Sequence, residues 1–110
     1  MEKSVLIIYT GGTIGMVNDP ETGALCPFNF EQIAKAVPEI KEFGFTIDSY
    51  TLPDIIDSSD LKPDLWENLC NIITKNYEKY CGFVILHGTD TMAYSASALS
   101  FMLENLTKPV

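Results

Sequence analysis

The sequence predicts an α/β domain built on an open, mostly parallel sheet that is flanked by helices. Short and almost uninterrupted apolar runs at residues 5–9 and 83–86 are typical of strands buried on both faces of such a sheet. Other segments carry apolar residues at helical spacing, as residues 64–80 do. The resulting alternation of strands and helices favours right-handed crossovers, which bring the carboxyl ends of the strands to one edge.

In the first half of the chain, residues 5–9 form the first predicted strand, which ends at a Thr-Gly-Gly sequence. Residues 16–28 are polar, contain proline and glycine and follow no period, so they predict a long loop with room for a small hairpin. Asn29 is placed to cap a short helix over residues 30–37. Residues 45–52 favour an extended strand.

In the second half, Pro63 is well placed as the first residue of a helix that runs to about Tyr80 and is broken by Gly82. The strand at residues 83–86 follows. A helix rich in alanine and serine is predicted over residues 92–105, and Lys108-Pro109-Val110 has the character of a strand beginning.

The composition and net charge of the chain limit the classes of partner that it can bind. Hydrophobic residues make up 46% and charged residues 20% of the 110 residues, a balance typical of a soluble globular protein. The net charge of −8 disfavours nucleic acid and anionic membrane surfaces as partners. No apolar run approaches the roughly 20 residues that a membrane span needs. Cys26, Cys70 and Cys81 are odd in number and lack metal-ligand spacing, so a reducing, cytoplasmic location is favoured.

Three polar loops follow three predicted strands, at residues 10–13, 57–60 and 88–91. Ligands of open α/β sheets bind at the carboxyl ends of the strands, so these hydroxyls and carboxylates are expected to converge in one crevice. Gly11 and Gly12 permit a tight turn that presents the Thr13 hydroxyl. The sequence contains neither of the glycine-rich phosphate-binding patterns, GxxxxGK[ST] and GxGxxG.

Each of these signals alone has a plainer interpretation. The glycine pair fits a sharp turn after a buried strand. Asp90 or Thr91 fits the cap of the following helix, and the Asp-Ser-Ser-Asp cluster at residues 57–60 fits a turn and a cap. His87, the only histidine, fits a hydrogen-bonded residue at a strand end better than a catalytic base.

Taken together, the loops resemble a known family. Residues 6–15, LIIYTGGTIG, resemble the first signature of the L-asparaginases, and residues 82–92, GFVILHGTDTM, resemble the second. Residues 56–61, IDSSDL, resemble the substrate-binding turn of the type I, cytoplasmic branch, where Ser59 stands in place of the glutamine found in other branches. The resemblance extends over all 110 residues.

The resemblance implies hydrolysis of L-asparagine to L-aspartate and ammonia. Thr13 is then the nucleophile, which forms an aspartyl ester that water cleaves. Thr89 resembles the second catalytic threonine, which belongs to a Thr-Lys-Asp proton relay. Asp90 resembles the acid of that relay and also holds the substrate ammonium group.

The resemblance also assigns substrate-binding groups. Ser58 would bind the α-carboxylate of asparagine, helped by the backbone at Asp57 and Ser59. The turns at Gly12 and Gly88 would supply oxyanion-hole amides, those of Thr13 and of the Thr89-Asp90 turn. No metal and no organic cofactor is implied.

Two features depart from the family pattern. The relay lysine lies downstream of this sequence, and the loop at residues 21–27 lacks the family's tyrosine. The resemblance accordingly implies that residues 1–110 are an incomplete amino-terminal domain, followed in the family by further strands and a second, smaller domain. It implies a homodimer or homotetramer with shared active sites, and a fragment that is inactive alone.

Other functions stay open at this point. One alternative is a related amidohydrolase, either a glutaminase-asparaginase or an amidotransferase subunit that acts on an amide carried by tRNA. Another is a non-catalytic α/β module that binds an amino acid in the same crevice.

Overall fold

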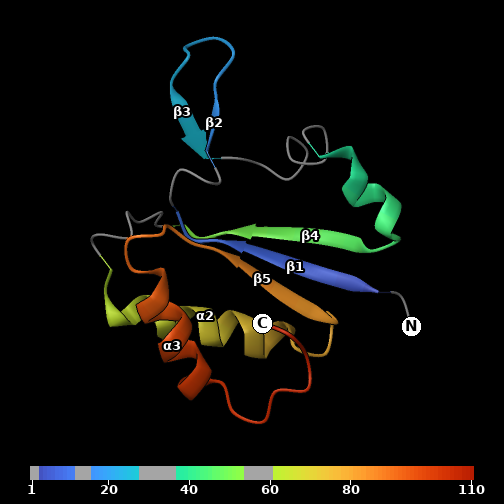
Figure 1. Cartoon of the computed structure of the whole chain (residues 1–110), viewed down its shortest axis with the longest axis vertical. Helices are drawn as coiled ribbons and strands as arrows, with labels where there is room; N and C mark the ends of the chain where they lie inside the picture. Colours follow the sequence, from blue (N-terminus) through green and yellow to red (C-terminus); the bar gives the residue numbers. More distant parts are fainter. Residues whose placement is uncertain (1–2, 12–15, 28–36, 54–60) are drawn as a thin grey trace.

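In the computed structural model, which describes residues 3–11, 16–27, 37–53 and 61–110, three strands form a parallel sheet. The central strand β1 (Ser4–Tyr9) lies between β4 (Thr46–Thr51) and β5 (Gly82–Leu86). The register pairs Tyr9 with Thr51 on one side and with Leu86 on the other. All three strands therefore end at one edge of the sheet (Figure 1). The predicted open, parallel α/β sheet is confirmed.

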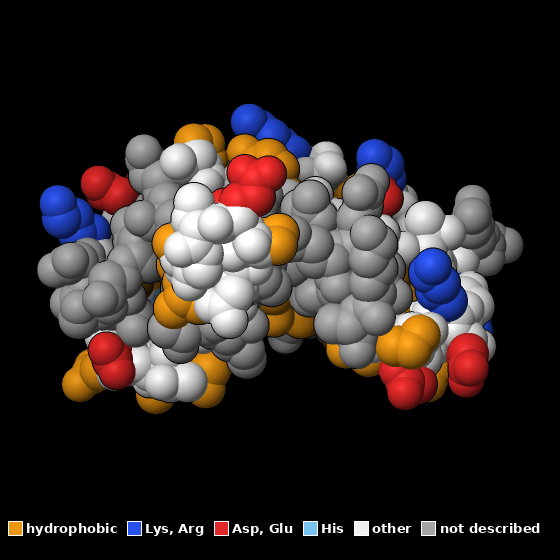
Figure 2. Space-filling model, turned by 90° about the horizontal axis from the view of Figure 1, so that it is seen from above, with side chains coloured by type: hydrophobic (Ala, Val, Ile, Leu, Met, Phe, Trp, Pro, Cys, Tyr) orange, Lys and Arg blue, Asp and Glu red, His pale blue; other side chains and the backbone are white. Residues whose placement is uncertain are grey.

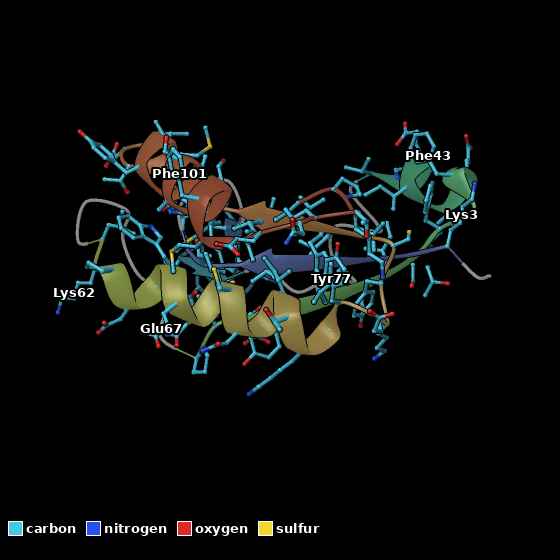
Figure 3. The ribbon with its side chains drawn as sticks, turned by 90° about the horizontal axis from the view of Figure 1, so that it is seen from below. Lys3, Phe43, Lys62, Glu67, Tyr77 and Phe101 are labelled. Atoms are coloured by element: carbon cyan, nitrogen blue, oxygen red, sulfur yellow. The ribbon has the colours of Figure 1, made fainter. Side chains whose placement is uncertain are left out.

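Two helices, α2 (Pro63–Asn76) and α3 (Met92–Met102), lie together on one side of this sheet (Figure 1). Pro63 is the first residue of α2, as its fixed φ and missing N–H favour. Lys62 and Glu67 point away from the sheet on the outer side of α2 (Figure 3). Leu65, Leu69 and Ile73, at helical spacing, form its buried stripe.

Both helices end earlier than the sequence pattern predicts. The expectation that the first helix reaches Tyr80 is wrong, because the Cys81 N–H already donates to the Ser4 carbonyl beside β1, at 2.7 Å. The chain must leave helical geometry before that point. The expectation that the second helix reaches residue 105 is also wrong. The N–H groups of Thr107 and Lys108 donate to the Tyr77 hydroxyl, which draws this segment back toward the end of α2.

Smaller elements complete the description. β2 (Met16–Asn18) and β3 (Leu25–Pro27) form an antiparallel hairpin, so the small hairpin expected in the loop is confirmed. A 3₁₀ helix, η2 (Pro38–Phe43), was not predicted, and the helix predicted over residues 30–37 lies almost wholly outside the described residues. Residues 108–110 were expected to begin a strand, and this expectation is wrong. The Phe83 N–H nevertheless donates to the Pro109 carbonyl beside β5.

The core lies between the sheet and the two helices. It contains Ile8 and Leu69, both fully buried, and Ile73, 1% exposed, with further apolar side chains from every layer: Leu6, Leu52, Leu65, Tyr80, Phe83 and Leu99. Tyr80 also donates a 2.6 Å hydrogen bond to the Asp48 carboxylate, which anchors the start of β5 to β4.

Truncation of Leu69 tests this core. In the whole protein, Leu69→Ala is expected to lower the free energy of unfolding by about 2–5 kcal/mol, because it leaves a cavity between helix and sheet. Glu67→Ala, on the outer side of the same helix, should change it by less than about 0.5 kcal/mol. Denaturant titration of the two variants checks the difference. Equal effects would show that α2 does not bury Leu69.

Candidate active site

The loops that carry the predicted chemistry begin at hydrogen-bonded strand ends. The Thr10 N–H donates to the Leu86 carbonyl at 3.1 Å, and the Thr10 hydroxyl donates to the same oxygen at 2.9 Å. On the other side of β1, the Leu52 N–H donates to the Tyr9 carbonyl at 3.0 Å. The three chain segments thus leave the sheet side by side, as the sequence predicted.

The strand order identifies where a ligand would lie. The chain passes from β1 to β4 on one side and then crosses to β5 on the other side of β1. Such a reversal opens a crevice at the carboxyl ends of the strands where the order changes, here next to β1 and β5. Gly11 follows β1 at this point with a φ of 135°, a conformation that suits glycine, and the rest of the predicted tight turn lies outside the described residues.

The predicted site residues fall into two groups. Gly88, Thr89 and Asp90 lie in the turn between β5 and α3, where Thr89 and Asp90 are exposed. The remaining predicted residues lie outside the described part of the chain: Gly12, Thr13, Asp57, Ser58 and Ser59. The structure therefore shows that the three loops start from neighbouring strand ends, but it does not describe the contacts of Thr13 or Ser58.

The plainer interpretation of this turn as a helix cap is correct only in position, with Thr91 as the N-cap residue. Thr91 is the residue before the first turn of α3, and its side chain makes no capping hydrogen bond. Within the described part of the chain, the Asp90 carboxylate takes part in no hydrogen bond or ion pair. An exposed, unpaired carboxylate at the crevice is available to a cationic ligand group.

His87 is a hydrogen-bonded residue at a strand end, as predicted. Its Nδ1 lies 2.6 Å from the Gly88 carbonyl oxygen, and its Nε2 lies 2.8 Å from Ser95 Oγ. The indole N–H of Trp66 donates to the same hydroxyl at 2.9 Å. Sequence reasoning missed Ser95 and Trp66. The signal that could have found Ser95 is its helical spacing from Leu99, which places a hydroxyl on the buried face of α3.

Charged side chains of both signs occur among the described residues on the face that carries the β2–β3 hairpin. Figure 2 shows acidic and basic side chains at both ends and over the middle of this face, without one dominant patch. Burial raises the pKa of Tyr9, so its hydroxyl stays protonated at neutral pH and does not serve as a base. Among the described residues, no group of three or more His, Cys, Asp or Glu side chains is arranged to hold a metal ion.

A cavity of about 320 Å³ lies behind the turn, between β5 and α3. Its lining is mostly apolar and includes Ile85, Met92 and Leu99, with His87 and Ser95 among its polar members. Such walls do not suit a zwitterion, so the crevice above the strand ends is the better place for a small polar ligand.

In the part of the chain that the structure describes, no helix has the length and apolar character of a membrane span.

Comparison with known proteins identifies the relatives of the chain. The family model of the asparaginase amino-terminal domain matches residues 4–110. L-asparaginase 1 of Escherichia coli K12 is 47% identical over 99% of this chain, which covers 32% of that protein. A component of the glutamyl-tRNA(Gln) amidotransferase of Pyrococcus abyssi is 50% identical over 96% of the chain, which covers 24% of that component. The chain thus spans a third or less of the length of these relatives.

Solved structures agree with this placement. L-asparaginase I of Vibrio cholerae has a TM-score of 0.84 and 45% identity, covering all of this chain, which spans 32% of the Vibrio chain. A probable cytoplasmic L-asparaginase of Campylobacter jejuni has a TM-score of 0.68 and 31% identity, covering 86% of this chain, which spans 27% of the Campylobacter chain.

Proposed function

Because the chain belongs to the asparaginase family, whose amino-terminal domain it matches over residues 4–110, we propose that the whole protein hydrolyses L-asparagine to L-aspartate and ammonia. The observation that supports this most is the turn Gly88-Thr89-Asp90. It lies at the reversal of strand order with the Thr89 and Asp90 side chains exposed and with the Asp90 carboxylate unpaired among the described residues.

In the proposed reaction, the Thr13 Oγ attacks the side-chain amide carbon of asparagine, and the Thr13 hydroxyl proton is passed on to the leaving nitrogen. Ammonia departs and leaves an aspartyl ester on Thr13, which water hydrolyses to aspartate and the free hydroxyl. Thr89 and Asp90 serve the proton relay, together with a lysine that this sequence does not contain.

Substrate binding follows from charge. The Asp90 carboxylate is an acceptor for the substrate ammonium group. Ser58, with the backbone of Asp57 and Ser59, takes the α-carboxylate. The turns at Gly12 and Gly88 supply amides for the oxyanion, and donors of this kind typically contribute about 3 kcal/mol each to lowering the barrier.

Compartment and assembly are part of the same proposal. Among the described residues, no disulfide joins Cys26, Cys70 or Cys81, which agrees with a reducing, cytoplasmic location. We place the whole protein in a homodimer or homotetramer in which a second domain of a neighbouring protomer closes the crevice.

A second function is favoured by one specific observation, the 50% identity to a component of an amidotransferase. The net charge of −8 opposes binding of tRNA, and the chain covers a greater share of the asparaginase relative. A glutaminase-asparaginase is the other amidohydrolase that must be distinguished from an asparaginase. The third possibility, a non-catalytic module that binds an amino acid, would show calorimetric binding without ammonia release.

Ammonia release decides among these functions. The whole protein is expected to release ammonia from free asparagine with a kcat/KM at least about 10-fold above that for free glutamine, because one extra methylene displaces the amide from the attacking hydroxyl. Coupled ammonia assays on the two amino acids provide the measurement. Comparable rates would indicate a glutaminase-asparaginase. No release from free asparagine, with amide formation on glutamyl-tRNA when a partner protein is added, would indicate the amidotransferase.

A further inference from the structure

Behind the proposed catalytic turn, hydrogen bonds connect three polar side chains to which the proposed reaction gives no role, two of them buried and Trp66 half-buried. Trp66 comes from α2, Ser95 from α3, and His87 from the residue after β5. Ser95 is 2% exposed and His87 is 7% exposed. Their hydrogen bonds join the two helices to the turn that carries Thr89 and Asp90.

The directions of the first and last hydrogen bonds in this series are fixed by the chemistry of Trp66 and of the Gly88 carbonyl. An indole N–H can only donate, so Ser95 Oγ accepts from Trp66. The Gly88 carbonyl can only accept, so His87 Nδ1 carries a proton and donates it. When the imidazole is neutral, its proton is therefore on Nδ1, and the Nε2 lone pair accepts the proton of the Ser95 hydroxyl. No buried polar atom of these side chains is left unpaired.

The hydrogen bond from His87 Nδ1 to the Gly88 carbonyl sets the orientation of the Thr89 N–H. The Gly88 carbonyl and the Thr89 N–H belong to one planar trans peptide unit, so they point in opposite directions. When His87 holds the carbonyl on the protein side, the Thr89 N–H is turned away from His87. Among the described residues, that N–H donates to no acceptor, so it is available to a ligand.

We propose that Trp66, Ser95 and His87 form a positioning chain that fixes the Gly88–Thr89 peptide and aims the Thr89 N–H at the oxyanion of the reaction. This inference rests on the proposed amide hydrolysis. His87 is a positioning residue here and not a general base, because its only free lone pair, on Nε2, is occupied by the Ser95 hydroxyl. Thr89 thereby contributes its backbone as well as its side chain.

Two substitutions of His87 separate positioning from general packing. Asparagine places an amide N–H close to the position of Nδ1, whereas glutamine reaches toward the position of Nε2 and leaves the Gly88 carbonyl without its donor. In the whole protein, His87→Gln is expected to lower kcat by about 10- to 100-fold, part of the loss typical of a missing oxyanion donor. KM should change by less than about 3-fold, because the donor acts mainly on the transition state. His87→Asn should retain kcat within about 5-fold of the unchanged protein, since it keeps most of the oxyanion donor's effect.

A matched pair of serine variants on α3 tests the hydrogen bond between Ser95 and His87. Ser95→Ala removes the hydroxyl that holds the Nε2 side of His87 and should lower kcat by about 10-fold. Ser100→Ala removes an exposed hydroxyl that donates only to the Ala96 carbonyl of the same helix, and it should leave kcat unchanged. Thermal midpoints are measured for all four variants. A kcat that follows the thermal midpoint alone, with His87→Asn no better than His87→Gln, would overturn the positioning role.

The tautomer gives a readout that does not depend on the substrate. With ¹⁵N-labelled histidine in the whole protein, the signal that disappears in His87→Asn is expected to show a protonated Nδ1 and an unprotonated Nε2 at neutral pH. An unprotonated Nδ1 would overturn the proposal even if asparagine is hydrolysed. If no amide is hydrolysed but the Nδ1–H tautomer is found, the failure lies in the proposed function and the hydrogen-bond chain stands.

Discussion

Replacing Thr13 by alanine in the whole protein is expected to lower kcat for asparagine by about 10⁴-fold or more, the order seen when a hydroxyl nucleophile is removed from a catalytic unit. Without its Oγ, no aspartyl ester forms, and water must attack the amide directly. KM, or the affinity for asparagine measured by calorimetry, should change much less, because Asp90 and the backbone still bind the ammonium and carboxylate groups.

Three variants make this result specific. Thr13→Ser keeps a hydroxyl and should retain a measurable part of the turnover. Thr89→Ala should also reduce kcat strongly, since it removes a member of the proton relay, but an ester on Thr13 could still form slowly and be detected by mass spectrometry after acid quenching. Near-normal turnover by Thr13→Ala would mean that Thr13 is not the nucleophile, and Thr89 would become the candidate.

Elements that depend on local pattern were predictable from the sequence. The continuous apolar runs indicated β1 and β5, although the strands are not buried on both faces as that pattern predicts, since Val84 of β5 is exposed. Pro63 marked the start of α2 through its fixed φ. The convergence of the loops followed from a general property of parallel sheets, and the hydrogen bonds at the ends of β1 agree with it.

Features set by contacts between distant residues were not predictable in this way. The ends of α2 and α3 depend on hydrogen bonds from Cys81 to Ser4 and from residues 107–108 to Tyr77, which no local period encodes. The chain of Trp66, Ser95 and His87 links residues 29 and 8 positions apart. Only the presence of a serine on an otherwise apolar helix face hints that a buried partner is required.

The chain of 110 residues, expressed alone, is expected to release no ammonia from asparagine above background. A threonine hydroxyl is a poor nucleophile at neutral pH without a base, and no lysine of this sequence stands in the relay motif that the family resemblance implies. The unpaired Asp90 carboxylate is exposed, and water weakens the attraction with which it would position a substrate ammonium group.

The exposed surface of the chain supports the same expectation. Phe101 is 83% exposed and Tyr94 is 68% exposed on α3, and Phe101 points outward in Figure 3. Val84, in the middle of β5, is 46% exposed, and β4 shows most of its length to solvent. Large apolar side chains in such positions favour association or marginal stability, which would leave the loops at the strand ends poorly fixed.

An ammonia assay on the purified chain, side by side with the whole protein and with the Thr13→Ala form of each, decides this prediction. Light scattering on the same samples reports whether the chain associates through its apolar surfaces. Saturable hydrolysis of asparagine by the isolated chain that disappears in its Thr13→Ala form would contradict the prediction. In that case Thr13, Thr89 and Asp90 would form a sufficient site, and the proton would have to pass through Thr89 and water rather than through a lysine.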